Sequence, residues 1–109
     1  ALETDFAKLP QPEKEDTTTE FKVRYDDIDV NNHVNNAVYP LWASESVDPA
    51  FRLEHVPQEL EIAFKKEGHY GERVKIITEI QENVSLHDIT ALSDGRELAK
   101  VRIKWQKRS

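Results

Sequence analysis

Apolar and polar residues alternate along much of this chain with a period of two, the pattern of a strand that buries one face. The first such stretch carries Phe21, Val23 and Tyr25 between charged residues. Four more expected strands lie around residues 60–64, 74–80, 84–92 and 99–105. The pattern therefore predicts five strands.

Two details refine the last strands. Residues 84–92 carry apolar positions of both parities, which indicates a bulge or burial on two faces. The sequence "SDG" at 93–95 is typical of a hairpin turn. The last two strands are therefore expected to be antiparallel neighbours.

A single helix is expected between the first two strands. Apolar side chains recur there at helical spacing. The apolar stripe comprises Val34, Val38, Leu41 and Trp42, and Glu45 follows at the same spacing. Either Asn35 or Asn36 would be a good N-cap. Pro40 conflicts with a helix interior, so the helix either begins near Pro40 or has a distorted first turn. Pro49 is expected to end the helix, and the stripe is expected to pack in the core, with the wall of an acyl tunnel as the alternative.

The order strand, helix, four strands predicts an α+β fold in which an antiparallel sheet wraps around one long central helix. Residues 18–109 form this domain in our interpretation. Residues 1–17 contain two prolines and many charges without periodicity, which indicates a linker or N-terminal arm. The arm would either lie on the domain or join it to something upstream.

Composition excludes several classes of function. The chain has 109 residues, a net charge of -6 and no cysteine, so it offers no thiolate nucleophile and no disulfide. The acidic balance argues against general nucleic-acid binding, and no apolar run is long enough to cross a membrane. We expect a cytoplasmic protein. Residues 100–109 are basic without an acid, which is either a solvated strand face or a surface for an anionic partner.

The stretch "DDIDVNNHVNN" at 26–36 carries the candidate chemistry. Asp29, Asn31 and His33 alternate, so in an extended segment they would point the same way. They would supply a base or nucleophile, an amide that orients water or substrate, and a proton-transfer group. The alternative is structural, because Asn and Asp also close tight turns. No second histidine stands at ligand spacing from His33, and no metal or cofactor is expected.

A resemblance favours the catalytic alternative. The stretch "VRYDDIDVNNHVNNAVYPLWASES" resembles the signature of hotdog-fold thioesterases, and above all of acyl-acyl carrier protein thioesterases. In that family D-x-N-x-H is followed by V-N-N, an aromatic residue and W-x-x-E, and a catalytic glutamate lies on the next strand. Glu67 in "LEIAFKKEG" takes the position of that glutamate, and Gly68 stands where plant members have a cysteine.

The resemblance implies hydrolysis of fatty acyl thioesters without a cofactor. Asp29, Asn31, His33 and Glu67 would be catalytic. Asn35 and Asn36, through a backbone amide, and Tyr39 and Trp42 would bind the substrate. Acyl carrier protein, or acyl-CoA, would be the substrate partner.

Family members carry two hotdog units, so this unit would pair with an upstream unit or form a homodimer. Two alternatives remain at this point: a single-hotdog acyl-CoA thioesterase, or a non-catalytic unit for acyl binding or assembly.

Overall fold

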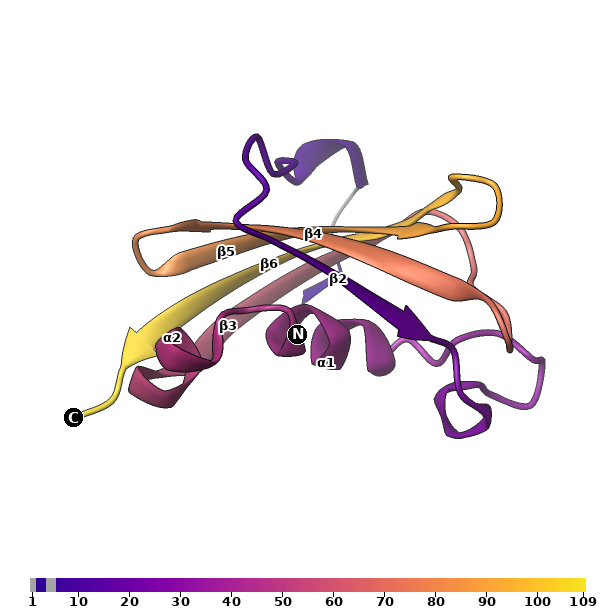
Figure 1. The fold of residues 1–109 in the computed structure, drawn as a ribbon, viewed down its shortest axis with the longest axis horizontal. Coiled ribbons are helices and arrows are strands. Elements are labelled where there is room, and N and C mark those ends of the chain that lie inside the picture. Colours follow the sequence, from indigo (N-terminus) through magenta and orange to yellow (C-terminus); the bar gives the residue numbers. More distant parts are fainter. Residues whose placement is uncertain (1, 4–5) are drawn as a thin grey trace.

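The computed structural model describes residues 2, 3 and 6–109 (Figure 1). One six-stranded sheet dominates it, with the strand order β1-β3-β6-β5-β4-β2. The strands are β1 (Leu2–Glu3), β2 (Thr17–Lys22), β3 (His55–Phe64), β4 (Arg73–Gln81), β5 (Val84–Ala91) and β6 (Glu97–Lys107). All neighbours pair antiparallel except β1 and β3, which are parallel. The five strands expected from alternation are therefore confirmed, with their ends moved by a few residues.

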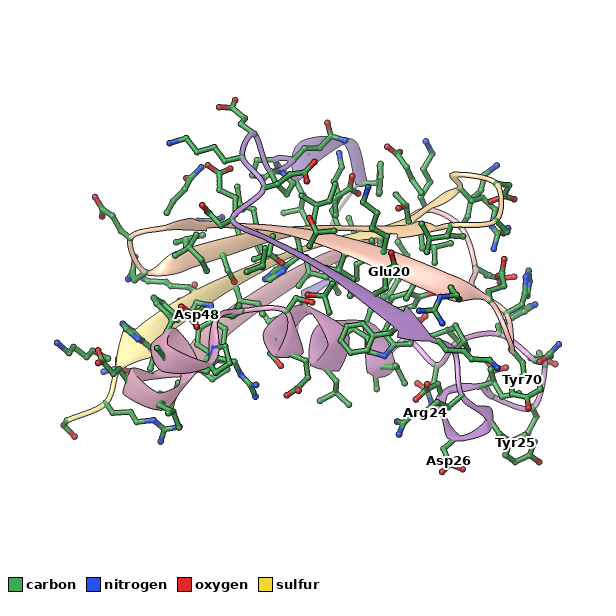
Figure 2. The ribbon with its side chains drawn as sticks, in the orientation of Figure 1. Glu20, Arg24, Tyr25, Asp26, Asp48 and Tyr70 are labelled. Carbon is green, nitrogen blue, oxygen red and sulfur yellow. The ribbon has the colours of Figure 1, made fainter. Side chains whose placement is uncertain are left out.

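The first strand ends earlier than its alternation predicts. Tyr25 is 75% exposed and begins a 3-10 turn, Tyr25–Asp27. The chain turns here because the buried Asp27 carboxylate accepts hydrogen bonds from the Arg24 backbone (2.8 Å) and guanidinium. Figure 2 shows Tyr25 beside Tyr70 near the end of β2. Their rings meet edge to face, with the centroids 6.2 Å apart.

The helical region differs from the expected single long helix. Helix α1 spans only Val38–Glu45 and lies against the concave face of the sheet (Figure 1). Pro40 is its third residue, where the missing N–H costs no intrahelical bond. Helix α1 ends before Pro49. Pro49 itself begins a second helix, α2 (Pro49–Glu54), which is capped by Asp48.

The expected N-cap is also wrong. Ala37 is the N-cap residue. The Ala37 backbone N–H donates a hydrogen bond to the Asn35 side-chain oxygen at 3.0 Å.

The core lies between α1 and the sheet. Tyr39, Trp42 and Ala43 of α1 are buried against strand residues such as Ile76 and Trp105. The stripe predicted to be core is buried at Val34 and Trp42, whereas Leu41 is 63% exposed. Strand β5 buries side chains of both faces and shifts register at Ile89/Thr90, as its mixed parity predicted.

The N-terminal segment covers the second face of the sheet (Figure 1). A 3-10 turn, Phe6–Lys8, leads to the buried Leu9. The Lys100 ammonium lies 3.4 Å from the carbonyls of Phe6 and Leu9 and 4.2 Å from the Phe6 ring centroid. The described part of residues 1–17 therefore packs on the domain; residues 1, 4 and 5 of the expected arm lie outside the described residues.

Candidate active site

The loop 29–33 is a closed turn rather than an extended segment. The Asp29 N–H donates to the His33 carbonyl at 2.8 Å, and Asn32 has a φ of 64°. The Asp29 Oδ1 accepts the backbone N–H groups of Asn31 (2.8 Å) and His33 (3.2 Å). Asp29 is therefore a turn-forming residue whatever else it does. Its Oδ2 has no hydrogen-bond partner among the described residues, and the same holds for the exposed Asn31 side chain.

A short antiparallel bridge joins this loop to the segment after β3. His33 pairs with His69, and the Val34 N–H donates to the Gly68 carbonyl at 2.9 Å. Side chains directly opposite in such a pair leave from the same face. Glu67 and His69 flank Gly68, so alternation places them on one side as well. The bridge thus gathers His33, Glu67 and His69 on one face of the backbone.

The opposite face of the bridge is packed. Val34 is buried there, and a side chain added at Gly68 would place its Cβ 3.0 Å from Val34 and 3.3 Å from Leu98. The Gly68 N–H donates to the Tyr39 hydroxyl at 3.3 Å. Gly68 therefore permits the close approach that brings Glu67 to the loop, and a cysteine would not fit here without movement.

His33 and Glu67 form the most direct side-chain contact of the site. The His33 Nε2 lies 3.1 Å from the Glu67 Oε2, with 35% and 63% of the two side chains exposed. Glu67 comes from the loop after β3, not from the strand itself as expected. The two residues resemble a base and the carboxylate that orients it, and both remain open to solvent.

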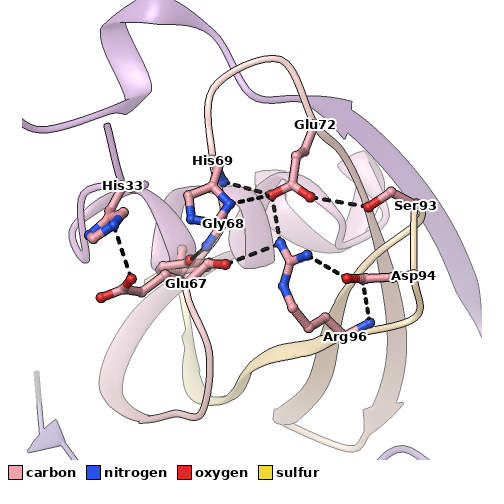
Figure 3. A network of polar contacts seen from close by, with 9 residues as sticks. His33, Glu67, Gly68, His69, Glu72, Ser93, Asp94 and Arg96 are labelled. Carbon is pink, nitrogen blue, oxygen red and sulfur yellow. Dashed lines mark hydrogen bonds and ion pairs between the residues drawn. The ribbon is translucent and has the colours of Figure 1, made fainter. Parts of the chain in front are cut away.

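A partly buried network of carboxylates around Arg96 lies behind this pair (Figure 3). Burial opposes ionisation of Glu72, but hydrogen bonds from the Arg96 guanidinium (2.6 Å), the His69 backbone (2.8 Å) and Ser93 outweigh it and lower its pKa. The same guanidinium donates to the Glu67 carbonyl at 3.2 Å. Glu72 and Arg96 thus hold both ends of the Glu67–His69 segment.

The predicted substrate-binding residues lie at the start of α1, with different surroundings. The Asn35 N–H is already donated to the Asp27 carbonyl at 2.8 Å. The Asn36 N–H has no hydrogen-bond partner in the part of the chain that the structure describes. Of the two backbone N–H groups, that of Asn36 is therefore the one available to donate a hydrogen bond to a substrate carbonyl oxygen. Tyr39 is buried, and burial raises the pKa of its hydroxyl.

A groove of about 490 Å³ runs between α1 and the edge strand β2. Its apolar wall is formed by Phe21, Val38, Leu41 and Trp42, and charged residues including Lys22 and Arg24 line its rim. The Trp42 ring stacks on Phe21 with the centroids 6.0 Å apart. Trp42 therefore belongs to both the core and the groove wall.

Three members of the site are not among the site residues predicted from the sequence: His69, Glu72 and Arg96. His69 lies far from His33 in sequence, yet their ring centroids are 5.4 Å apart. The alternation of Glu67, Gly68 and His69 contained the signal, because residues two apart in an extended segment face the same way. Nothing comparable in the sequence relates Arg96 to Glu72.

The folded arrangement is that of a hotdog unit, and comparisons with known proteins agree. Residues 10–107 match the family described as "Acyl-ACP thioesterase C-terminal domain". The chain therefore belongs to this family. The predicted α+β hotdog fold is confirmed by solved structures. A 12:0-ACP thioesterase from Umbellularia californica superposes with a TM-score of 0.78 and 20% identity, over 96% of this chain and 42% of that one.

Two further relatives are also described as acyl thioesterases or acyl-ACP hydrolases. A protein described as an oleoyl thioesterase from Lactobacillus plantarum shares 28% identity with a TM-score of 0.72, over 94% of this chain and 43% of that one. The chloroplastic acyl-[acyl-carrier-protein] hydrolase FATB2 of Cuphea viscosissima is 27% identical over 96% of this chain and 27% of its own length. This chain thus spans about a quarter of that curated relative.

Proposed function

We propose that this chain hydrolyses fatty acyl thioesters of acyl carrier protein to a free fatty acid and the carrier thiol. The observation that carries the proposal is the contact of His33 Nε2 with Glu67 Oε2 at 3.1 Å, in a chain that belongs to the acyl-ACP thioesterase family. The names of the relatives from Umbellularia and Cuphea, which refer to acyl-ACP hydrolysis, support the choice of carrier.

The roles follow from the contacts that these side chains make. Glu67 Oε2 lies 3.1 Å from His33 Nε2, and this carboxylate would orient the imidazole ring. Asp29 has Oδ2 free of hydrogen bonds among the described residues and takes the part of base or nucleophile. Asn31 would orient the attacking water. Water adds to the thioester carbonyl, the C–S bond breaks, and a proton passes to the leaving thiolate.

The start of α1 would stabilise the oxyanion formed in this step. The Asn36 N–H, which has no hydrogen-bond partner among the described residues, lies just before the positive end of α1. Such a donor contributes about 10²–10³ in rate. The groove walled by Phe21, Val38, Leu41 and Trp42 would take the acyl chain. Its half-apolar, half-charged lining suits a fatty acid chain that ends in a polar head.

A second unit would complete the assembly. Strand β2 is an edge of the sheet, and the groove with the exposed Leu41 lies beside it. Edge strands of this kind pair readily with another chain. We propose that a homodimer, or an upstream hotdog unit of the same protein, covers this edge. Analytical ultracentrifugation would show dimers of the wild-type chain and monomers of Leu41→Lys; a monomeric wild type would contradict the homodimer.

None of the helices in the described part of the chain is long and apolar enough to cross a membrane. We propose the cytoplasm for this chain, whereas the name of the Cuphea relative refers to the chloroplast.

The proposal is tested by thiol release from matched acyl-ACP and acyl-CoA substrates. Wild type should hydrolyse acyl-ACP with the higher kcat/KM, and Asp29→Asn and His33→Ala should each lose about 10²–10⁴ in rate. His55→Ala is the control, because His55 stacks on Phe51 at the start of β3, away from this bridge. Faster hydrolysis of acyl-CoA would favour the acyl-CoA thioesterase, and acyl binding without turnover would favour the non-catalytic unit.

A further inference from the structure

We propose that His33, Glu67 and His69 bind a divalent metal ion of the zinc type, and that the bound ion blocks the hydrolytic site. One ligand atom from each of these side chains lies within 4.8 Å of the other two. The inhibitory part of this proposal rests on the proposed function, whereas metal binding itself does not.

The spacing of the ligand atoms suits tetrahedral coordination. Zinc binds imidazole nitrogen and carboxylate oxygen at about 2.0–2.2 Å, so two ligands of one tetrahedral ion lie about 3.3 Å apart. His33 Nε2 and Glu67 Oε2 are 3.1 Å apart. The separation of up to 4.8 Å among the three ligand atoms would have to shorten by about 1.5 Å, which a rotation of the half-exposed His69 side chain would supply. Figure 3 shows Glu67 extending toward His33, with His69 above the pair.

A carboxylate lies beside the third ligand. His69 Nδ1 is 3.3 Å from the Glu72 Oε1, a position that favours the tautomer with its proton on Nδ1. In that tautomer Nε2 carries the lone pair that a metal requires. Metal-binding histidines typically donate their second ring N–H to a carboxylate in this way. Glu72 is in turn hydrogen-bonded by Arg96, so its carboxylate is fixed beside the His69 ring.

The charge around the three residues also favours a cation. The network contains three carboxylates, from Glu67, Glu72 and Asp94, and one guanidinium, from Arg96. With neutral imidazoles, three negative charges against one positive charge leave a net charge of −2. Two imidazoles and a carboxylate select zinc and its neighbours over magnesium, which prefers an all-oxygen set.

Occupancy would stop the proposed reaction. The ion would take the carboxylate oxygen of Glu67 that orients His33, together with a ring nitrogen of His33. The imidazole could then neither be held by Glu67 nor pass a proton as before. Zinc should therefore inhibit thioester hydrolysis, and a chelator should restore the rate.

Isothermal titration of metal-free protein with ZnCl₂ tests the site without any substrate. Wild type and the His55→Gln control should bind one Zn²⁺ with equal affinity, and MgCl₂ should give no binding at this site. His69→Gln should weaken the affinity about tenfold or more, and Glu72→Gln by about 10–100-fold. Equal affinity of wild type and His69→Gln would overturn the metal site.

Inhibition is measured separately, as the ratio of rates with and without Zn²⁺ in each variant. That ratio should fall with Zn²⁺ in wild type and in His55→Gln, and stay near one in His69→Gln over the same range. Binding by wild type without any loss of rate would overturn the inhibitory role. Lack of hydrolysis in metal-free buffer would refute the proposed function and the inhibition, while the titration would still decide the metal site.

Discussion

Buried His87 makes the stability of this fold depend on pH between 7.5 and 5. Its side chain is fully buried in β5, with Nδ1 2.7 Å from the Thr78 hydroxyl and Nε2 2.8 Å from the Ser85 hydroxyl. The same Ser85 oxygen accepts the Trp105 indole N–H at 2.9 Å. No carboxylate takes part in these hydrogen bonds, so burial lowers the pKa of His87 from 6.5 to about 3.

The sign and size of the effect follow from proton linkage. The unfolded chain binds a proton at His87 below about pH 6.5, whereas the folded chain does so only near pH 3. Stability from this residue is therefore complete above pH 6.5 and is lost as the pH falls, by about 1.4 kcal/mol per pH unit. Between pH 7.5 and pH 5 the expected loss in the free energy of unfolding is about 2 kcal/mol.

Urea unfolding at half-unit pH intervals measures this slope. A His87→Gln variant is the comparison: it is less stable at pH 7.5 but lacks the slope that His87 causes. Histidine NMR shifts should show a neutral His87 ring at pH 5 in the folded wild type. Equal slopes in wild type and variant, or a charged His87 at pH 5, would refute the reasoning.

Three further predictions concern the bridge and the groove. Gly68→Cys should lower the free energy of unfolding by about 1–3 kcal/mol, because the new Cβ would lie 3.0 Å from Val34, and it should not raise the hydrolysis rate. A free energy of unfolding within about 0.5 kcal/mol of wild type in urea would show that Val34 moves aside easily. Arg96→Met should lower the free energy of unfolding by about 1–3 kcal/mol at pH 7, since it leaves the mostly buried Glu72 carboxylate without its cation. This loss should shrink at low pH, where Glu72 is protonated. Leu41→Lys should leave monomer stability within about 0.5 kcal/mol of wild type, because Leu41 is largely exposed; a larger loss would place Leu41 in the core.

Much of the fold could be predicted from the sequence because burial of one sheet face imposes a period of two. That period located β3 to β6 within a few residues, and "SDG" located the β5–β6 turn. The pattern failed where a local polar contact competes with it. Tyr25 continues the apolar alternation, but Asp27 binds Arg24 and turns the chain before Tyr25 can join the strand.

The second helix was missed for a related reason. Proline can end one helix or begin another, and only its neighbours distinguish the two. Asp48 accepts the Ala50 N–H at 3.2 Å and so caps a new helix at Pro49. The sequence contained this Asp-Pro pair, which is a signal for a helix start.

Part of the site's geometry could be predicted. The resemblance assigned both His33 and Glu67 to the candidate site, and the structure places their side chains in contact. Their catalytic roles stay a prediction. The loop itself was harder to interpret, because Asp29 serves its own turn through Oδ1, and alternation alone suggested an extended segment. Alternation relates His69 to Glu67, but its position beside His33 also depends on the bridge between the two loops, which requires a glycine at position 68.

The central claim is that His33 and Glu67 act as one unit in thioester hydrolysis. A double-mutant cycle on kcat/KM for acyl-ACP, with His33→Ala, Glu67→Gln and the double variant, tests it most directly, with Glu97→Gln of the Lys65 ion pair as control. Residues that act as a unit are not additive, so the double variant should be no slower than the slower single variant. Losses that multiply, or a Glu67→Gln variant as fast as Glu97→Gln, would contradict the account.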